Sequence, residues 1–141
     1  MTASRVLSFR LSEQLFALDV NSVVEVRPAP SITKVPEAPS SLLGITEVRG
    51  ELLCVFDPRP GLELPTDVHA SGAMSVIVAT NEGPIALMVD EIGDVLELSA
   101  HALERPPATM SKKARTLIRH VCQRENELLF VLNPNQLALA S

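Results

Sequence analysis

The three histidines of this chain are its best candidates for acid–base chemistry, and none has a partner that would make it catalytic. His69 and His101 lie in segments of loop composition, His120 lies in an apolar strand, and no Ser or Cys nucleophile motif stands beside them. Asp90 and Glu91 would point to opposite faces of a strand, which does not suit a shared proton or a metal ion. The motifs that mark nucleotide, zinc and calcium sites are missing from the sequence. We therefore predict no enzyme activity, no cofactor and no metal site.

The two cysteines also lack the spacing of a metal or redox site. Cys54 and Cys122 are far apart in sequence, and each lies within an apolar strand of its own half. This placement favours two buried, reduced thiols in a cytoplasmic protein. A disulfide between the two halves stays open as the alternative, because the cysteines hold similar places in them.

The polar feature most suited to recognition is the dipeptide Arg49-Gly50, which lies between two apolar runs. A guanidinium at an exposed hairpin corner can form two hydrogen bonds with a carboxylate or with main-chain carbonyls of a partner. The alternative is that Arg49 pairs with an acid of its own fold, and Glu25 is the candidate. Nearby apolar residues predict either an exposed binding patch or ordinary core packing; they are Val23, Val24, Val26, Ile45 and Val48.

The bulk composition excludes several classes of partner. A chain of 141 residues is long enough for one domain with a real core. Its net charge of −5, its pI near 5.1 and its lack of Trp and Tyr argue against nucleic-acid binding. No apolar run approaches the roughly 18 residues of a membrane helix, so direct membrane insertion is not expected.

The elements that would position Arg49 come from an internal repeat. The stretch Glu51 to Pro58 returns in similar form as Glu127 to Pro134, and Ala17 to Val20 returns as Ala86 to Val89. Self-similar segments in the same order indicate a duplicated structural unit. Two like units would meet at a junction and present two distinct outer faces, a geometry suited to holding several partners.

Short apolar runs separated by turn residues predict an all-β fold of small barrels. Expected strands cover residues 7–11, 15–20, 23–26, 45–48, 51–56, 75–80, 85–89, 95–98, 118–122 and 128–132. Four prolines between residues 28 and 39 predict an extended surface connection. Residues 57–71 predict an exposed loop that joins the two halves.

The order and spacing of several short motifs resemble the CheW-like family over nearly the whole chain. These motifs are Val24-Glu25-Val26, Val35 to Pro39, Leu43-Gly44-Ile45, Val48-Arg49-Gly50, Val55-Phe56-Asp57 and Val89 to Ile92. The resemblance implies a single domain over residues 1–141, built from two small five-stranded SH3-like β-barrel subdomains packed together, with short helical turns. Subdomain one would mainly cover 15–70 and subdomain two 71–135, with the terminal segments open to exchange between them.

What the resemblance implies for function is a non-catalytic adaptor. Family members link the cytoplasmic tips of methyl-accepting chemoreceptors to the regulatory domain of a CheA-type histidine kinase, at membrane-associated arrays. Carried over by position, Arg49 matches an arginine near the receptor-binding surface and Glu25 the glutamate that positions it, at the corner that Gly50 completes. Val24, Val26, Ile45 and Val48 are then candidates for the receptor groove. Other CheW-like proteins are further candidate partners.

The sequence departs from the family pattern mainly in its second half. Glu47 stands where Asn is common, Ala86 and His120 replace glycines, and Asn133 replaces the closing Asp. These departures favour an accessory or system-specific adaptor, for pilus or other non-flagellar signalling, over the principal chemotaxis adaptor. A separate alternative, which the scarcity of aromatic residues disfavours, is a small-ligand sensor with a site in or between the barrels.

Overall fold

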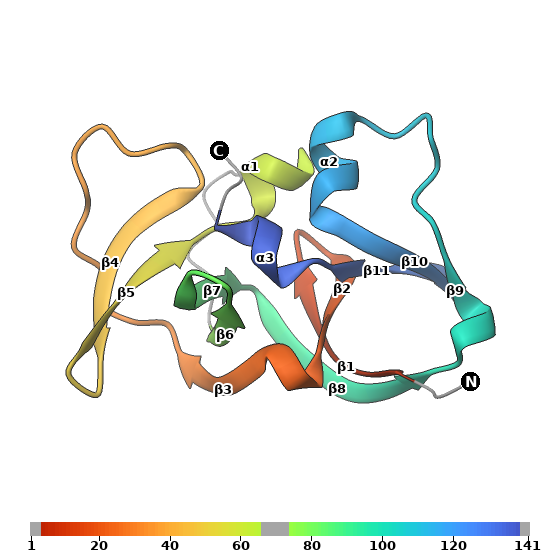
Figure 1. The fold of residues 1–141 in the computed structure, drawn as a ribbon, viewed down its shortest axis with the longest axis horizontal. Helices are drawn as coiled ribbons and strands as arrows, with labels where there is room; N and C mark the ends of the chain where they lie inside the picture. Colours follow the sequence, from red (N-terminus) through yellow and green to blue (C-terminus); the bar gives the residue numbers. More distant parts are fainter. Residues whose placement is uncertain (1–3, 66–73, 139–141) are drawn as a thin grey trace.

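Two β-sheets contain nearly all of the regular structure, shown in Figure 1. The computed structural model describes residues 4–65 and 74–138. The six-stranded sheet has the order β8 (Glu91–Leu98), β1 (Ser4–Leu11), β2 (Gln14–Asp19), β11 (Glu127–Leu132), β10 (Ile118–Arg124) and β9 (Leu103–Glu104). The five-stranded sheet has the order β3 (Val23–Pro28), β6 (Met74–Thr80), β7 (Gly83–Val89), β5 (Glu51–Phe56) and β4 (Leu42–Val48).

Short helical segments connect the strands. They are η1 (Val20–Ser22), α1 (Arg59–Leu62), η2 (Ala100–Ala102), α2 (Lys112–Leu117) and α3 (Pro134–Leu137). The predicted all-β class with two small β-barrel units and short helical turns is confirmed. One detail differs from the predicted five strands per unit, because the two-residue strand β9 adds a sixth strand to one sheet.

The two sheets repeat the same arrangement, in agreement with the echo in the sequence. From one edge, β8-β1-β2-β11-β10 matches β3-β6-β7-β5-β4. The central pair is parallel in both sheets, with Ala17 opposite Val131 in one and Ala86 opposite Val55 in the other. All four residues belong to the echoed stretches, so the repeated sequence occupies equivalent places in the fold.

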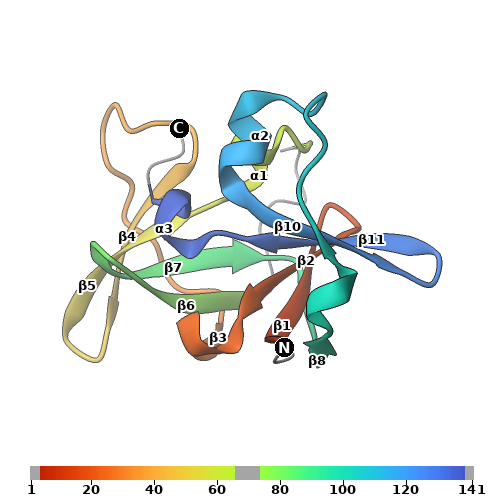
Figure 2. The same cartoon turned by 45° about the vertical axis from the view of Figure 1, so that its right-hand side comes forward.

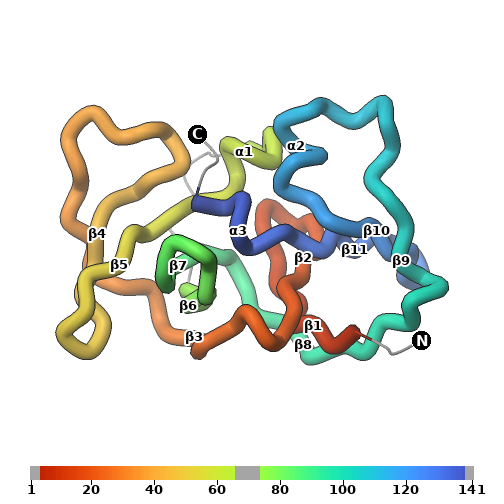
Figure 3. Tube along the Cα trace, viewed as in Figure 1, coloured from red at the N-terminus to blue at the C-terminus, as the bar shows by residue number. Residues whose placement is uncertain are grey.

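The two halves of the chain exchange their first hairpins. The first hairpin of the N-terminal half lies in the sheet whose other strands come from the C-terminal half, and the first hairpin of the C-terminal half lies in the other sheet. Hairpin β1–β2 joins β8 to β11, and hairpin β6–β7 joins β3 to β5, so the chain crosses between the sheets (Figure 3). Sheet membership therefore does not follow the order of the chain. Whether residues 15–70 and 71–135 behave as separate subdomains stays a prediction.

The central hairpins are apolar on both faces because each face packs in a different core. In β7, Ile85, Leu87 and Val89 lie in the cluster between the two sheets, whereas Ala86 and Met88 lie in the interior of the five-stranded sheet. The alternation of side chains along a strand produces this division. In the six-stranded sheet, β1 and β2 divide their side chains in the same way. A near-continuous apolar run in the sequence therefore indicates a strand that lies between the two sheets, with both of its faces buried.

The segment after β5 is where the predicted exposed loop is wrong in part. Residues 59–62 form the helix α1, and Arg59 within it is only 2% exposed. Its guanidinium is held by carboxylates from two elements, which the sequence did not reveal. Residues 66–73 of that predicted loop, including His69, lie outside the described residues.

Gly44 is required by the close approach of the connection between β3 and β4. Its φ is +153°, and a Cβ at this position would lie 2.3 Å from the main-chain oxygen of Thr33. Thr33 and Ile45 exchange backbone hydrogen bonds of 2.9 and 2.8 Å at the same place. The glycine lets this part of the connection pair with the edge of β4.

We expect Gly44→Ala to lower the free energy of unfolding by about 2–3 kcal/mol, through backbone strain and overpacking. Urea unfolding followed by circular dichroism measures the change. Gly50→Ala is the matched control, because Gly50 has a positive φ of 82° and no atoms near its missing Cβ. The control should cost about 1 kcal/mol from strain alone. Equal costs for the two substitutions would contradict the steric argument.

Candidate functional site

A groove lies between the two edge strands of the five-stranded sheet, β3 and β4. It has a volume of about 600 Å³. One wall is residues 27–31 at the end of β3, and the other is residues 45–48 of β4 together with Leu52 of β5. The proline-rich start of the β3–β4 connection thus forms one side of the groove.

Exposed apolar side chains lie in this groove and on the outer face of the neighbouring strand β3. Leu52 is 72% exposed, and Val24 and Val26 on β3 are 57% and 37% exposed. Ile45 is half-buried in the groove wall. Val24 and Val26 share one face of β3 because side chains alternate along a strand. Leu52 and Ile45 thus line the groove, whereas Val24 and Val26 form an exposed apolar strip on the face of β3 opposite to Arg27, which lines the groove.

Val48 differs from the other apolar candidates. It is 8% exposed and packs in the interior of the five-stranded sheet with Val55 and Met88. Of the two predicted alternatives for this residue, core packing describes its side chain, although it also contributes to the lining of the groove.

Arg49 and Glu25 are brought together beside this groove. Arg49 is at the β4–β5 turn, where it and Gly50 both have positive φ, as a two-residue hairpin turn requires. Its Nη1 contacts Glu25 Oε1, and its Nη2 donates to Glu25 Oε2 at 3.2 Å. Arg27 donates to the same carboxylate at 3.2 Å. Because Glu25 belongs to β3, the pair ties the turn to the opposite edge strand.

The ion pair leaves Arg49 available to a partner. The Arg49 side chain is 70% exposed, whereas that of Glu25 is 21% exposed. Hydrogen bonds from Arg49, and secondarily from Arg27, hold the pKa of the Glu25 carboxyl below its ordinary value, against the opposing effect of burial. Glu25 therefore stays charged over the neutral range and orients a guanidinium that projects into solvent.

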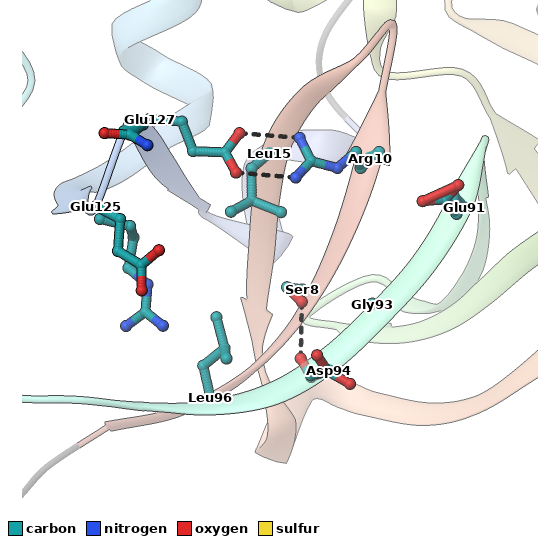
Figure 4. A pocket seen from close by; sticks show the side chains of 11 residues that line it. Ser8, Arg10, Leu15, Glu91, Gly93, Asp94, Leu96, Glu125 and Glu127 are labelled. Atoms are coloured by element: carbon teal, nitrogen blue, oxygen red, sulfur yellow. Dashed lines mark hydrogen bonds and ion pairs between the residues drawn. The ribbon is translucent and has the colours of Figure 1, made fainter.

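A second groove of about 590 Å³ lies at the corresponding place in the six-stranded sheet, as Figure 4 shows. It opens between β8 and the β10–β11 turn. Arg10 donates to both oxygens of Glu127 at 2.9 Å, and Ser8 Oγ donates to the Asp94 carbonyl at 2.8 Å. Six charged residues line this groove, whereas the first groove has two, Arg27 and Glu47, together with prolines and apolar residues. The two halves thus share a shape and differ in chemistry.

The residues considered for catalysis are not assembled into a site within the described ranges. No three His, Cys, Asp or Glu side chains there lie close enough to hold a metal ion. His101 is exposed, and His120 is half-buried, where desolvation and then Arg119 lower its pKa. Cys54 and Cys122 are both free, so the alternative of a disulfide is wrong.

A buried ion-pair cluster was not predicted from the sequence. Arg59 Nη1 donates to Asp57 Oδ1 at 2.9 Å, and its Nη2 contacts Asp90 Oδ1. Arg59 Nε donates to Ser12 Oγ at 3.2 Å, and the Ser12 main-chain N–H donates to Asp90 Oδ2 at 2.7 Å. The cluster joins the end of β5, the β1–β2 turn and the β7–β8 crossover. The acidic Asp57, next to Pro58 at a strand end, was the signal that could have indicated it.

Comparisons with known proteins agree with this architecture. The CheW-like domain family matches residues 5–140. The chemotaxis protein CheW of Bacillus subtilis (strain 168) is 25% identical over 134 residues, which cover 95% of this chain and 86% of that protein. The chemotaxis protein CheW of Rhizobium meliloti (strain 1021) is 27% identical over 128 residues, covering 88% of this chain and 80% of that protein.

A solved structure has the same fold. The scaffolding protein TtCheW from Thermoanaerobacter tengcongensis superimposes with a TM-score of 0.84 at 24% identity, covering 97% of this chain and 92% of that chain. Among the described residues no helix is long and apolar enough to cross a membrane. With a family match over nearly its full length and an agreeing fold, this chain belongs to the CheW-like domain family.

Proposed function

We propose that this protein is a non-catalytic adaptor of bacterial chemotaxis, which couples the cytoplasmic tips of chemoreceptors to a CheA-type histidine kinase. The family match and relatives that carry the name chemotaxis protein CheW support this role. In this proposal the protein is cytoplasmic and joins arrays beneath the membrane by binding other proteins. Its work is recognition, with no chemical step of its own.

The observation that carries the proposal is the groove beside Arg49, in whose lining the apolar residues Leu52 and Ile45 are open to solvent. An apolar surface with a charged rim is typical of a protein-docking site, because burial of the apolar groups supplies affinity and the rim supplies orientation. Ile45 and Leu52 would contact the receptor tip in the groove, and Arg49 would bind a carboxylate or carbonyl at its edge. Val24 and Val26 would contact a partner on the outer face of β3. Glu25 acts on the receptor indirectly, by orienting Arg49.

The kinase would bind elsewhere on the same molecule. The two sheets offer two outer faces with different chemistry, so one molecule can hold a receptor and a kinase domain together. The groove of the six-stranded sheet has more charged residues in its lining than the groove of the five-stranded sheet, which favours different partners for the two. An accessory adaptor for non-flagellar signalling, or a small-ligand sensor, has no comparable support, since the relatives described above carry the name CheW.

Charge reversal at Arg49 tests the proposal. We expect Arg49→Glu to weaken binding of a receptor-tip fragment about tenfold or more, since a rim cation is replaced by a repulsive charge. The melting temperature should hardly change, because the Arg49 side chain is mostly in solvent. Isothermal titration calorimetry and thermal unfolding measure the two effects.

Two further variants make the result specific. Arg5→Glu is the matched control, since Arg5 is exposed on β1 and has no ion pair among the described contacts. The double variant Glu25→Arg/Arg49→Glu keeps an ion pair but reverses it, and it should still bind poorly. Full affinity of Arg49→Glu would show that the receptor docks elsewhere. Unfolding of Arg49→Glu would show that the Glu25 pair serves the fold.

A further inference from the structure

Five cations gather around the short helix α2 and its flanking segments, away from both grooves. Lys112, Lys113 and Arg115 lie on α2, Arg105 directly follows β9, and Arg119 lies on β10, which continues α2. All five are exposed. We call this surface the α2 face. In Figures 1 and 2, α2 lies on the opposite side of the molecule from β3 and β8.

None of the cations of the α2 face forms an ion pair within the described part of the chain, although the Glu63 carboxylate accepts a hydrogen bond from Ser111 at the start of α2. The ion pairs found there use Arg10, Arg27, Arg49 and Arg59, none of which belongs to this face. Arg115 donates through Nε to the Met110 carbonyl at 3.0 Å, and Arg119 donates to Asn133 Oδ1 at 3.3 Å. These neutral acceptors orient two of the cations without cancelling their charge.

The fold holds this face in place. Ala114 and Leu117 on the inner side of α2 are 6% and 1% exposed and pack in the cluster between the sheets. Ser111 caps the helix by accepting from the Ala114 main-chain N–H at 3.1 Å. At the other end, the Asn133 N–H donates to the Leu117 carbonyl at 2.8 Å. A fixed helix presents its cations at a lower ordering cost than a flexible loop would.

We propose that the α2 face is a docking surface for an acidic segment of a partner protein. Charge complementarity selects this occupant, because a cluster of unpaired cations attracts a matching run of carboxylates. A nucleic acid or an anionic membrane fits less well, since an extended polyanion would also meet the other charges of a chain with net charge −5. A short acidic segment contacts the α2 face alone.

A second copy of this chain is a weaker complement. Its main acidic strip carries Glu91, Asp94 and Glu97 along β8. On the neighbouring strand β1, Arg5 lies opposite Glu97, and Arg124 lines the same groove as Asp94. These interleaved cations would repel the α2 face of a neighbouring molecule.

The test uses the full chain and a fluorescent decapeptide of glutamate as the probe. We expect Lys112→Glu/Lys113→Glu to weaken binding of this peptide about tenfold at low salt, with binding by the unchanged protein also lost at high salt. Fluorescence anisotropy measures both effects. Arg5→Glu/Lys34→Glu is the control with the same change of net charge, at exposed positions outside the α2 face, and should change affinity less than about twofold.

Three results would overturn the proposal. One is peptide binding that the α2 variant leaves unchanged, and another is an equal loss in the control variant. The third is tighter binding of a single-stranded DNA or of anionic lipid vesicles than of the peptide. Arg49→Glu should keep its affinity for the peptide, so failure at the α2 face and failure of the receptor groove are separable results.

Discussion

Arg59→Met is expected to lower the free energy of unfolding by about 3–5 kcal/mol, the cost of breaking a buried ion pair from one side. Arg59 is 2% exposed, and Asp57 beside it is 4% exposed. Burial opposes the charge on Arg59, and the carboxylates of Asp90 and Asp57 outweigh this effect, so that its pKa is raised. Without the guanidinium, the Asp57 carboxylate would stay buried and unpaired.

The Arg59 cluster should also affect how the sheets are joined. Its partners are Asp57 after β5 of one sheet, Ser12 at the β1–β2 turn of the other, and Asp90 at the crossover from β7 to β8. The corresponding contact in the other half is neutral, with Asn135 Oδ1 accepting from the Asn81 main-chain N–H at 2.8 Å. The charged contact therefore carries more of the coupling between the sheets.

Urea unfolding of Arg59→Met, with circular dichroism and hydrogen exchange, checks this expectation. Protection should fall most for the amides of Ser12 and Arg59, whose N–H groups donate to carboxylates of the cluster. Arg59→Lys keeps the positive charge but loses the forked geometry, so its cost should lie between those of the wild type and Arg59→Met. A cost below about 1 kcal/mol for Arg59→Met would contradict the role of the cluster.

Phe16→Ala is the second large effect that we expect, with a loss of about 3–5 kcal/mol from removal of a buried aromatic ring. Phe16 is 2% exposed at the junction between the sheets. Its ring lies 6.4 Å from that of Phe9 and 5.6 Å from that of Phe130. Three of the four phenylalanines of the chain meet here, and there is no Trp or Tyr to take their place.

The position of Phe16 between the sheets determines how Phe16→Ala should unfold. Its cluster contains buried residues of both sheets, such as Leu18 and Leu87, so a cavity there weakens both at once. Thermal unfolding of Phe16→Ala should stay a single transition at a lower temperature. Phe16→Leu is the control, because it keeps most of the volume and should cost less than about 1.5 kcal/mol. Two separate transitions in Phe16→Ala would show that the sheets unfold independently.

Much of the candidate site could be predicted, because its signals are local. A two-residue turn between two apolar runs places Arg49-Gly50 at a hairpin corner, and the structure has Arg49 and Gly50 at that corner with positive φ. The contact between Arg49 and Glu25 was one of two predicted alternatives, and the structure contains it. The burial of Val48 could not be decided in advance, since alternation along a strand does not say which face meets the core.

Local patterns in the sequence were enough to predict most strands of this protein. The echo between Glu51–Pro58 and Glu127–Pro134, and the two-residue periodicity of the strands, indicated a duplicated all-β fold, because those patterns depend on neighbours in the chain. The folded chain showed, in addition, that hairpins β1–β2 and β6–β7 pair across the two halves and that Arg59 is buried among carboxylates. These features could not be predicted because strand pairing and burial depend on residues distant in sequence, whereas the patterns we used involve only neighbours in the chain.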